Sequence, residues 1–417
     1  MYKKSSLAFI ASSLLITSGQ SFGNGFALNE QSVSSLGTAH AGRASAALDA
    51  TTVYGNPAGM SRLQQEELSG GFIAIIPDVE IDNYSATNAL GPVPGGMNDD
   101  ITKATPVPFG YYVNPLNEKW SFGFGVYSPF GLGTNYDSNS VSRYLADKTE
   151  LLIVNFQPTL SYKVNDDLSV GLGLIASYAK TTFSSMLPVT EGTVEAKGDD
   201  WGFGYNLGVL YQLTPHTRVG LTYHSKIDYN LNTETKVRNL FPLFGPTNAN
   251  IDGSMKTTTP ESVDISLTHE LDSQWTLYAG ANWTRWSRWD AITINNSNSP
   301  TPLFDSIGQD LNWHDSWGYG IGASYQLTPQ WVLRAGLALD ESPAGSTQNA
   351  RLPLADRKIV TFGAGWKASE NLSVDVAYSY LRQGKFTLNQ QDNNGNSFQA
   401  DYKAAAHGLG LQLNYRF

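Results

Sequence analysis

The stretch Trp201-Gly202-Phe203-Gly204-Tyr205-Asn206-Leu207-Gly208-Val209-Leu210-Tyr211-Gln212-Leu213 indicates the fold class, because two kinds of side chain alternate along it. The odd-numbered positions carry large apolar or aromatic residues, and the even-numbered positions carry Gly, Asn or Gln, except at Leu210. Successive side chains of a β-strand point to opposite faces, so this period of two predicts a strand with one apolar face and one small or polar face. The same alternation returns over 317–327 and over 409–417.

The content of the two faces favours a membrane barrel over a soluble sandwich. Both fold classes alternate, but here aromatic residues stand at both ends of the apolar face and glycine crowds the other face. Outer-membrane β-barrels have this arrangement, with lipid outside, aromatic girdles at both interfaces and a polar lumen inside. The N-terminus agrees, since Lys3 and Lys4 precede the apolar run 7–16 and small residues at 21 and 23 suit cleavage after Gly23. Residues 1–23 are therefore expected to be a signal peptide.

Short polar turns alternate with long polar stretches along the rest of the chain. The six turns lie at 113–120, 162–168, 211–216, 269–275, 325–331 and 366–372, and the seven long stretches lie near 82–103, 131–148, 183–198, 233–253, 295–310, 342–354 and 389–399. Short periplasmic turns and long outer loops are typical of outer-membrane barrels. The rhythm predicts an all-β membrane protein in which residues 67–417 form a 14-stranded antiparallel outer-membrane β-barrel.

The segment before the barrel, residues 24–66, does not alternate and is rich in Ala, Gly and Ser. The side chains of so wide a barrel cannot fill its lumen. We therefore expect this segment to be a small N-terminal helical hatch that plugs the barrel. Its apolar content and the turn Gly55-Asn56-Pro57-Ala58-Gly59 argue against a disordered tail, because proline makes a turn rigid.

Composition and spacing exclude several function classes. The net charge of -10 disfavours a nucleic-acid partner, and the absence of Cys removes thiol chemistry. The six His residues lack zinc-binding spacing, and the glycine repeats lie within strands rather than before helices. We therefore expect no enzymatic activity, no metal and no cofactor. Charges that face the lumen are expected to pair with each other or with water; they are Asp264, Arg334, Asp375 and Arg416.

Several motifs carry a family resemblance. Gly25-Phe26-Ala27-Leu28-Asn29-Glu30-Gln31-Ser32, Gly37-Thr38-Ala39 and Asn56-Pro57-Ala58 resemble the hatch of the FadL family, the bacterial long-chain fatty-acid outer-membrane transporters. The likeness continues through the barrel, for example at 221–228 and 340–343. The resemblance implies a monomeric barrel in outer-membrane lipid that takes up long-chain fatty acids or similar hydrophobic molecules.

The resemblance also implies a route: capture at extracellular loops, passage into the plugged lumen, and lateral release through a kink in the third strand beside the Asn-Pro-Ala turn of the hatch. The hatch residues expected to act in gating are Asn56, Pro57 and Ala58. The third strand here reaches Ser128-Pro129-Phe130-Gly131, where proline removes a ladder donor, although Pro129 could instead simply begin an extracellular loop. Lateral release suits such a ligand, because about 0.8 kcal/mol per CH₂ makes roughly 10 kcal/mol for about sixteen carbons entering water.

Capture is expected where apolar residues interrupt polar loops, since exposed apolar clusters mark binding surfaces. The candidates are Leu240, Phe241, Leu243 and Phe244 in one loop and Phe183 and Leu187 in another. The basic residue that the family carries on its fifth strand falls at Ser185, so Arg288 or His314 would have to bind a carboxylate.

Two alternatives stay open at this point. The ligand could be an uncharged aromatic hydrocarbon, as in related branches of the family. The barrel could also be structural, adhesive or a diffusive porin, although a plugged lumen argues against free diffusion.

Overall fold

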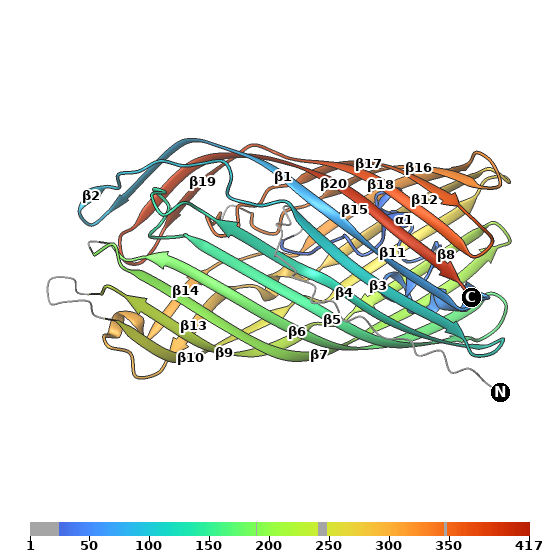
Figure 1. The fold of residues 1–417 in the computed structure, drawn as a ribbon, viewed down its shortest axis with the longest axis horizontal. Helices are drawn as coiled ribbons and strands as arrows, with labels where there is room; N and C mark the ends of the chain where they lie inside the picture. The colour runs from blue at the N-terminus through green and yellow to red at the C-terminus, as the bar shows by residue number, and fades with distance from the viewer. Residues whose placement is uncertain (1–24, 189, 241–247, 346–347) are drawn as a thin grey trace, which may run out of the picture.

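The computed structural model describes residues 25–188, 190–240, 248–345 and 348–417, so the predicted signal peptide lies outside the described residues. The chain forms one antiparallel sheet that closes on itself as an elongated barrel (Figure 1). Its strands are β1 (Glu67–Asn88), β2 (Gly91–Pro92), β3 (Thr105–Pro115), β4 (Trp120–Asn135), β5 (Lys148–Lys163), β6 (Leu168–Met186), β7 (Thr193–Thr214), β8 (Thr217–His224), β9 (Ile227–Arg238), β10 (Ala249–Thr259), β11 (Ser262–Glu270), β12 (Trp275–Thr284), β13 (Ala291–Asn296), β14 (Ser306–Asp310), β15 (Ser316–Gln326), β16 (Trp331–Asp340), β17 (Arg357–Lys367), β18 (Leu372–Gln383), β19 (Phe386–Gln391) and β20 (Ser397–Arg416).

The barrel has the predicted 14 strands. Some strands are kinked and carry two labels, namely β8 with β9, β10 with β11, β12 with β13, β14 with β15, and β18 with β19, while β2 lies within a loop. The last strand closes the ring on the first, because β20 pairs with β1 from Glu67↔Arg416 to Thr87↔Ser397. An ion pair crosses this seam, with Arg416 Nε 2.8 Å from Glu67 Oε2.

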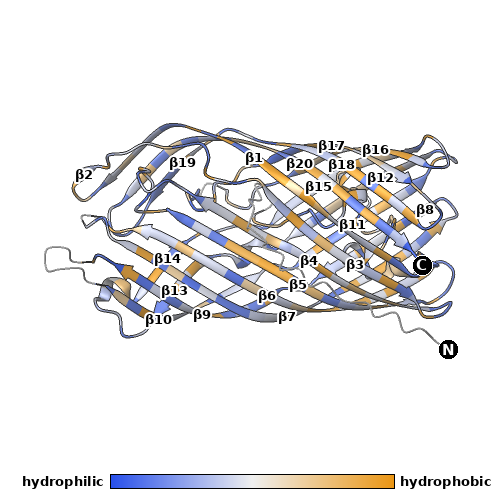
Figure 2. Ribbon diagram, viewed as in Figure 1, coloured by the Kyte–Doolittle hydropathy of each residue, from blue (hydrophilic) through white to orange (hydrophobic). Residues whose placement is uncertain are grey.

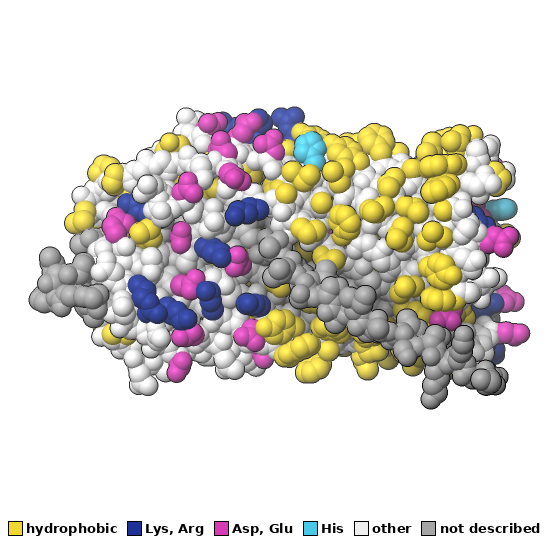
Figure 3. Space-filling view, viewed as in Figure 1, with side chains coloured by type: hydrophobic (Ala, Val, Ile, Leu, Met, Phe, Trp, Pro, Cys, Tyr) yellow, Lys and Arg dark blue, Asp and Glu magenta, His cyan; other side chains and the backbone are white. Residues whose placement is uncertain are grey.

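An apolar band surrounds the half of the barrel that ends in the short turns (Figures 2 and 3). Its side chains point outward, and Phe203 is 76% exposed and Ile321 60% exposed. Lys, Arg, Asp and Glu gather over the half that carries the long loops (Figure 3). A surface with this much contiguous exposed apolar area suits lipid rather than water. Among the described residues, no helix has both the length and the apolar character needed to span a membrane.

Most of the long connections are shorter than predicted, although the one between β16 and β17 is slightly longer, and the interpretation of 183–198 as a loop was wrong. Strand β6 continues to Met186 and β7 begins at Thr193. Along β7 the outward face carries Glu195 and Lys197 and then Trp201, which marks the edge of the apolar band. The strand keeps its alternation beyond the lipid, but its outward face becomes charged there because it meets water.

The segment before β1 packs inside the barrel as three short helices, α1 (Val33–Leu36), α2 (Thr52–Gly55) and the 3-10 helix η1 (Pro57–Arg62) (Figure 1). We call residues 25–66 the hatch. Hydrogen bonds to the final strand hold it, since Val33 N donates to Gln412 Oε1 (2.8 Å) and Gln412 Nε2 donates to Asp49 Oδ2 (2.9 Å). The hatch therefore occupies the lumen as an ordered plug.

Candidate functional site: a plugged lumen with a break in its wall

The Asn-Pro-Ala turn fastens the hatch to the barrel wall. Asn56 is buried, and its Nδ2 donates to Ala44 O (2.6 Å) within the hatch and to Val209 O (3.0 Å) on β7. Its Oδ1 accepts from Ala58 N (3.0 Å), which caps η1 in the manner of an N-cap asparagine. The turn thus joins hatch and wall through one side chain.

Two wall glycines make this close approach possible. A Cβ on Gly208 would lie 2.0 Å from Asn56 Oδ1, and a Cβ on Gly171 would lie 2.4 Å from the Pro57 carbonyl carbon. Any larger residue at either position would push the turn away from the wall. The small residues of the lumen face therefore leave space for the hatch backbone.

The wall is broken between the second and third strands of the barrel. Strand β3 pairs with β4 only from Pro115↔Ser121 to Gly110↔Val126, although β3 stays paired with β1 as far as Thr105. On its other side β4 keeps its pairing with β5 through a bulge between Tyr127 and Phe130. The predicted residues Ser128, Pro129, Phe130 and Gly131 lie at this break. Their part in release stays a prediction.

A sequence signal for the break was missed on β3. Pro106 and Pro108 lie just beyond the last residue that pairs with β4. Proline has no N–H for a ladder and is found at strand edges and bulges. Prolines on two neighbouring strands at the same level would have predicted an unpaired edge on both sides of the gap.

The start of the hatch fills the free edge of β4. Leu28 N donates to Pro129 O (2.8 Å), and Gly131 N donates to Phe26 O (3.0 Å), so that Ala27 and Phe130 form an antiparallel bridge. The side chain of Gln31 adds a bond from Nε2 to Ser128 O (3.1 Å). Residues 26–28, which we call the closing segment, thus take the place that β3 leaves.

The position of the closing segment corrects one expectation. The resemblance placed the Asn-Pro-Ala turn beside the kinked strand, but η1 packs mainly on β5, β6 and β7. The reason is that the wall glycines Gly171 and Gly208, on β6 and β7, provide the close approach that the turn needs. The hatch residues at the break are the closing segment and the Gln31 side chain.

An aromatic cluster covers the closing segment inside the barrel. Phe26 is fully buried, and its ring centroid lies 4.3 Å from that of Trp289, 4.7 Å from Trp286 and 5.5 Å from Phe130. The 3-10 helix η2 (Trp286–Arg288) carries part of this cluster where the kink between β12 and β13 turns inward. The cluster belongs to one apolar group that also contains Leu132, Leu151, Ile153, Met255, Leu311, Trp313, Leu352 and Leu354.

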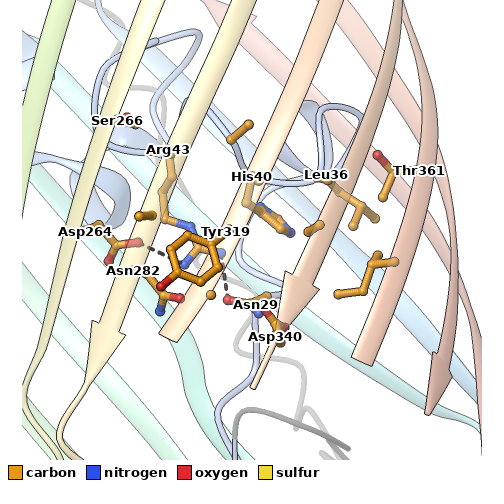
Figure 4. A pocket seen from close by; sticks show the side chains of 18 of the residues that line it. Asn29, Leu36, His40, Arg43, Asp264, Ser266, Asn282, Tyr319, Asp340 and Thr361 are labelled. Carbon is orange, nitrogen blue, oxygen red and sulfur yellow. Dashed lines mark hydrogen bonds and ion pairs between the residues drawn. The ribbon is translucent and has the colours of Figure 1, made fainter. Parts of the chain in front are cut away.

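Two cavities beside the hatch are small, and both have mixed linings. One of about 50 Å³ lies at the break and is lined by Leu28, Tyr54, Pro129 and Phe130 among others. Another of about 80 Å³ lies between the hatch and β11, β12 and β15–β17, and its lining includes Arg43, Asp264 and Asn282 (Figure 4). Ligand pockets usually measure about 300–1,000 Å³. A ligand that enters either of these two cavities therefore has to displace side chains.

Figure 4 shows how Arg43 of the hatch lies in the cavity of about 80 Å³. Arg43 Nη1 lies 3.6 Å from Asp264 Oδ1 on β11, and Arg43 Nη2 donates to Asn29 Oδ1 (2.7 Å). Elsewhere in the lumen Arg334 pairs with Asp375 at 2.6 Å. The four charges predicted to face the lumen are thus paired, Arg334 with Asp375, Asp264 with Arg43 of the hatch, and Arg416 with Glu67.

The two residues predicted to bind a carboxylate already have partners within the protein. Arg288 is bound to Glu261, through Nε and through an Nη2–Oε1 bond of 2.6 Å, and Arg285 shares the same carboxylate at 3.2 Å. His314 is exposed, and its Nδ1 bonds to Asp315 O at 2.8 Å. Parity along a strand could not reveal Glu261, which lies on a different strand and is brought to Arg288 by the kink. In the part of the chain that the structure describes, no three His, Asp or Glu side chains could hold a metal ion.

The predicted capture residues fall into two groups. Leu187 and Leu240 pack in one apolar cluster with Val194, Val237, Ile251 and Phe304, so the structure brings the two loops together. Phe183 lies on β6 and packs against the cluster of Phe26 instead. Phe241, Leu243 and Phe244 lie outside the described residues.

Comparison with known proteins identifies the family to which this barrel belongs. The family model described as "Outer membrane protein transport protein (OMPP1/FadL/TodX)" matches residues 14–417. The chain belongs to this family. It is 31% identical over 436 residues to the 47 kDa outer membrane protein of Pasteurella multocida, covering 98% of this chain and 97% of that protein. It is 29% identical over 454 residues to the long-chain fatty acid transport protein of Escherichia coli O6:H1, covering 100% and 99%.

Two solved structures share the fold. A Pseudomonas aeruginosa FadL homologue superposes with a TM-score of 0.85 at 22% identity, covering 94% of this chain and 100% of that one. The Ralstonia pickettii toluene transporter TbuX superposes with a TM-score of 0.69 at 18% identity, covering 92% and 97%. This member of the FadL/TodX family is therefore an outer-membrane transport protein for hydrophobic substrates.

Proposed function

We propose that this outer-membrane protein takes up long-chain fatty acids and releases them sideways through the break between β3 and β4. The observation that carries the proposal is the exchange of partners along β4, which leaves β3 after Val126 and bonds to the closing segment instead. A barrel strand normally keeps both neighbours, because an open edge in lipid leaves backbone groups unsatisfied. Here a removable piece of the plug satisfies them.

The energetics favour a sideways path for such a ligand. Transfer of about sixteen carbons from an apolar site into periplasmic water would cost roughly 10 kcal/mol. The break lies within the apolar band of the wall, since the outward Phe124 precedes it on β4. A chain that leaves there moves from one apolar environment to another and avoids this cost.

The apolar cluster supplies a route to the break. It is continuous from Leu352 and Leu354, in the loop between β16 and β17, to Phe26 and Phe130 at the closing segment. We propose that a ligand captured near Leu187 and Leu240 enters this cluster and displaces Phe26. Withdrawal of the closing segment then opens the break toward lipid.

A second candidate ligand is an uncharged aromatic hydrocarbon. The richness of the cluster in Trp and Phe favours it, because aromatic rings pair in offset or edge-to-face geometry. The toluene transporter TbuX has the same fold, which shows only that the fold also accommodates such cargo.

Uptake measurements separate the candidates. Cells that lack their own transporter would express this protein or an empty vector and receive radiolabelled oleate or radiolabelled toluene. We expect the protein to raise the initial rate of oleate uptake and to leave toluene uptake near the vector level. A rise with toluene alone would favour the second candidate. No rise with either compound would overturn both and favour a structural or adhesive barrel.

A further inference from the structure

The loop between β16 and β17 folds into the barrel and reaches the opposite wall. Its Ala350, Leu352 and Leu354 are buried, and Tyr136 OH donates to Ala350 O (2.6 Å). The backbone N of His314 donates to Pro343 O (3.0 Å) at the start of the loop. The loop thereby carries one charged side chain, Arg351, across the lumen to β5 and β6.

The guanidinium of Arg351 has only neutral partners. Its Nη1 donates to Ser184 O (2.8 Å), Thr149 Oγ1 (3.2 Å) and Lys148 O (3.4 Å), and its central carbon lies 6.0 Å from the ring centroid of Phe183. The residues outside the described ranges include no Asp or Glu. Every carboxylate side chain of the protein is therefore accounted for, and none lies within 4.0 Å of Arg351.

Arg351 is partly buried and has no counter-ion within 4.0 Å. Buried charges are normally paired, because their desolvation is costly. Burial lowers the pKa of Arg351 to about 10, and the more distant Asp147 offsets this only in part. Eight other arginines pair with carboxylates; they are Arg43, Arg143, Arg218, Arg285, Arg288, Arg334, Arg357 and Arg416. Arg62 and Arg382 have no such partner but are exposed, and partly buried Arg238 donates to Val237 O and Ala249 O.

The surroundings of Arg351 suit a molecule with one charged end and a long apolar tail. The Phe183 ring lies 6.0 Å from the guanidinium carbon and also packs on the apolar cluster that leads to Phe26. A cavity of about 20 Å³ on that side is lined by Leu151, Phe183, Met255 and Trp289 among others. Arg351 lies beyond the lipid band along the barrel axis, because at its height Lys148 and Glu150 form an ion pair of 2.9 Å on the outward face of β5.

We propose that Arg351 binds the carboxylate of a long-chain acid whose tail lies in the apolar cluster. This inference rests on the proposed function and names the head-group partner for it. With the residues that the structure describes, Arg351 forms hydrogen bonds through Nη1 only. Its Nε and Nη2 therefore remain for the two carboxylate oxygens of the ligand in a bidentate pair. The ligand then supplies the charge that the protein omits.

Binding to the purified full-length protein tests this assignment. Oleate and oleyl alcohol serve as probes at pH 8, because they share one tail and differ in the charge of the head group. We expect Arg351→Gln to raise the Kd for oleate by about ten- to one-hundred-fold, as loss of a charge-assisted hydrogen bond does. The Kd for oleyl alcohol should stay within about twofold, and Arg351→Lys should recover part of the oleate affinity.

Controls separate this role from a structural one. Arg382 is exposed on β18, so Arg382→Gln should leave both Kd values unchanged. Equal loss of both probes in Arg351→Gln, or no loss of either, would overturn the assignment. A second test needs only the wild-type protein and applies even if Arg351→Gln does not fold. The wild-type protein should bind oleate at least about tenfold more tightly than oleyl alcohol, and equal affinities would refute the proposal. If the wild-type protein bound neither probe, the fatty-acid function itself would fail.

Discussion

A disulfide between cysteines that replace Ala27 and Phe130 should stop transport without unfolding the barrel. The two residues are antiparallel partners in the bridge that joins the closing segment to β4. Such partners have Cα atoms about 4.5–5.5 Å apart, which lies within the range that a disulfide spans. The chain contains no Cys, so Ala27→Cys with Phe130→Cys allows a single disulfide only.

The magnitudes show why a covalent link is needed. Three hydrogen bonds hold the closing segment, from Leu28 N, Gly131 N and Gln31 Nε2. At about 1 kcal/mol each, with about 1.5–3 kcal/mol for burial of Phe26, withdrawal costs about 5 kcal/mol. A bound ligand can supply that much by replacing Phe26 in the cluster. A disulfide that closes a loop of about 100 residues stabilises the folded state by about 4.7 kcal/mol and excludes withdrawal altogether.

The assay compares one protein in two redox states. Cells that carry the double variant would take up radiolabelled oleate before and after treatment with dithiothreitol. We expect uptake to be lost in the oxidised state and restored on reduction, while the barrel stays heat-resistant on gels in both states. Each single substitution serves as a control for the lost Phe130 ring. Equal uptake by the oxidised and the reduced protein would refute release by withdrawal of the closing segment.

Three further predictions concern the hatch and the outer loops. Asn56→Ala removes two bonds from the side chain and one cap, so the hatch should loosen by about 2–3 kcal/mol; uptake should fall while the barrel stays heat-resistant, and unchanged uptake would remove the turn from the mechanism. Replacing Phe241 and Phe244 with Ser removes apolar area worth about 3–6 kcal/mol if a ligand covers it fully, so uptake should weaken at low oleate concentration and recover at high concentration; an unaltered concentration dependence would place capture elsewhere. The Arg143 guanidinium lowers the pKa of Glu191 by hydrogen bonding, so this link stabilises the loops above the usual carboxyl pKa and is lost as pH falls through the lowered value; since Glu191 is half exposed, the effect should be under about 1 kcal/mol, and limited proteolysis against pH should show Glu191→Gln already loosened at neutral pH.

The strand pattern was predictable because lipid enforces it. Trp201, Phe203 and Tyr205 all face outward and must be apolar, so alternation revealed the strands, and the rhythm of short turns and long polar stretches revealed their number. Beyond Trp201 the constraint ends, and Glu195 and Lys197 resemble a loop although they continue the strand. Sequence reasoning therefore placed the membrane part of the barrel correctly and misjudged the part above it.

The site was less predictable because it depends on contacts between distant segments. Arg288 and Glu261 meet only through kinks in two strands, and nothing in their local sequence announces the pair. Arg351 left a weak signal, a cation directly before the apolar run Leu352-Pro353-Leu354 of a loop expected to be polar. Asn56 was found because an Asn-Pro turn has a local meaning, but its wall partner, Val209 O on β7, was not.

The bonds between the hatch and Gln412 bear on the order in which the protein assembles. The hatch is made first and β20 last, yet Val33 N and Asp49 Oδ2 both bond to Gln412 on β20, the strand that closes the seam with β1. A ring that sealed around an empty lumen would have to admit a folded plug past the loops afterwards. We therefore expect the hatch to pack against the sheet before the barrel closes. The last strand, β20, then docks on the hatch and pairs with β1 in the same step.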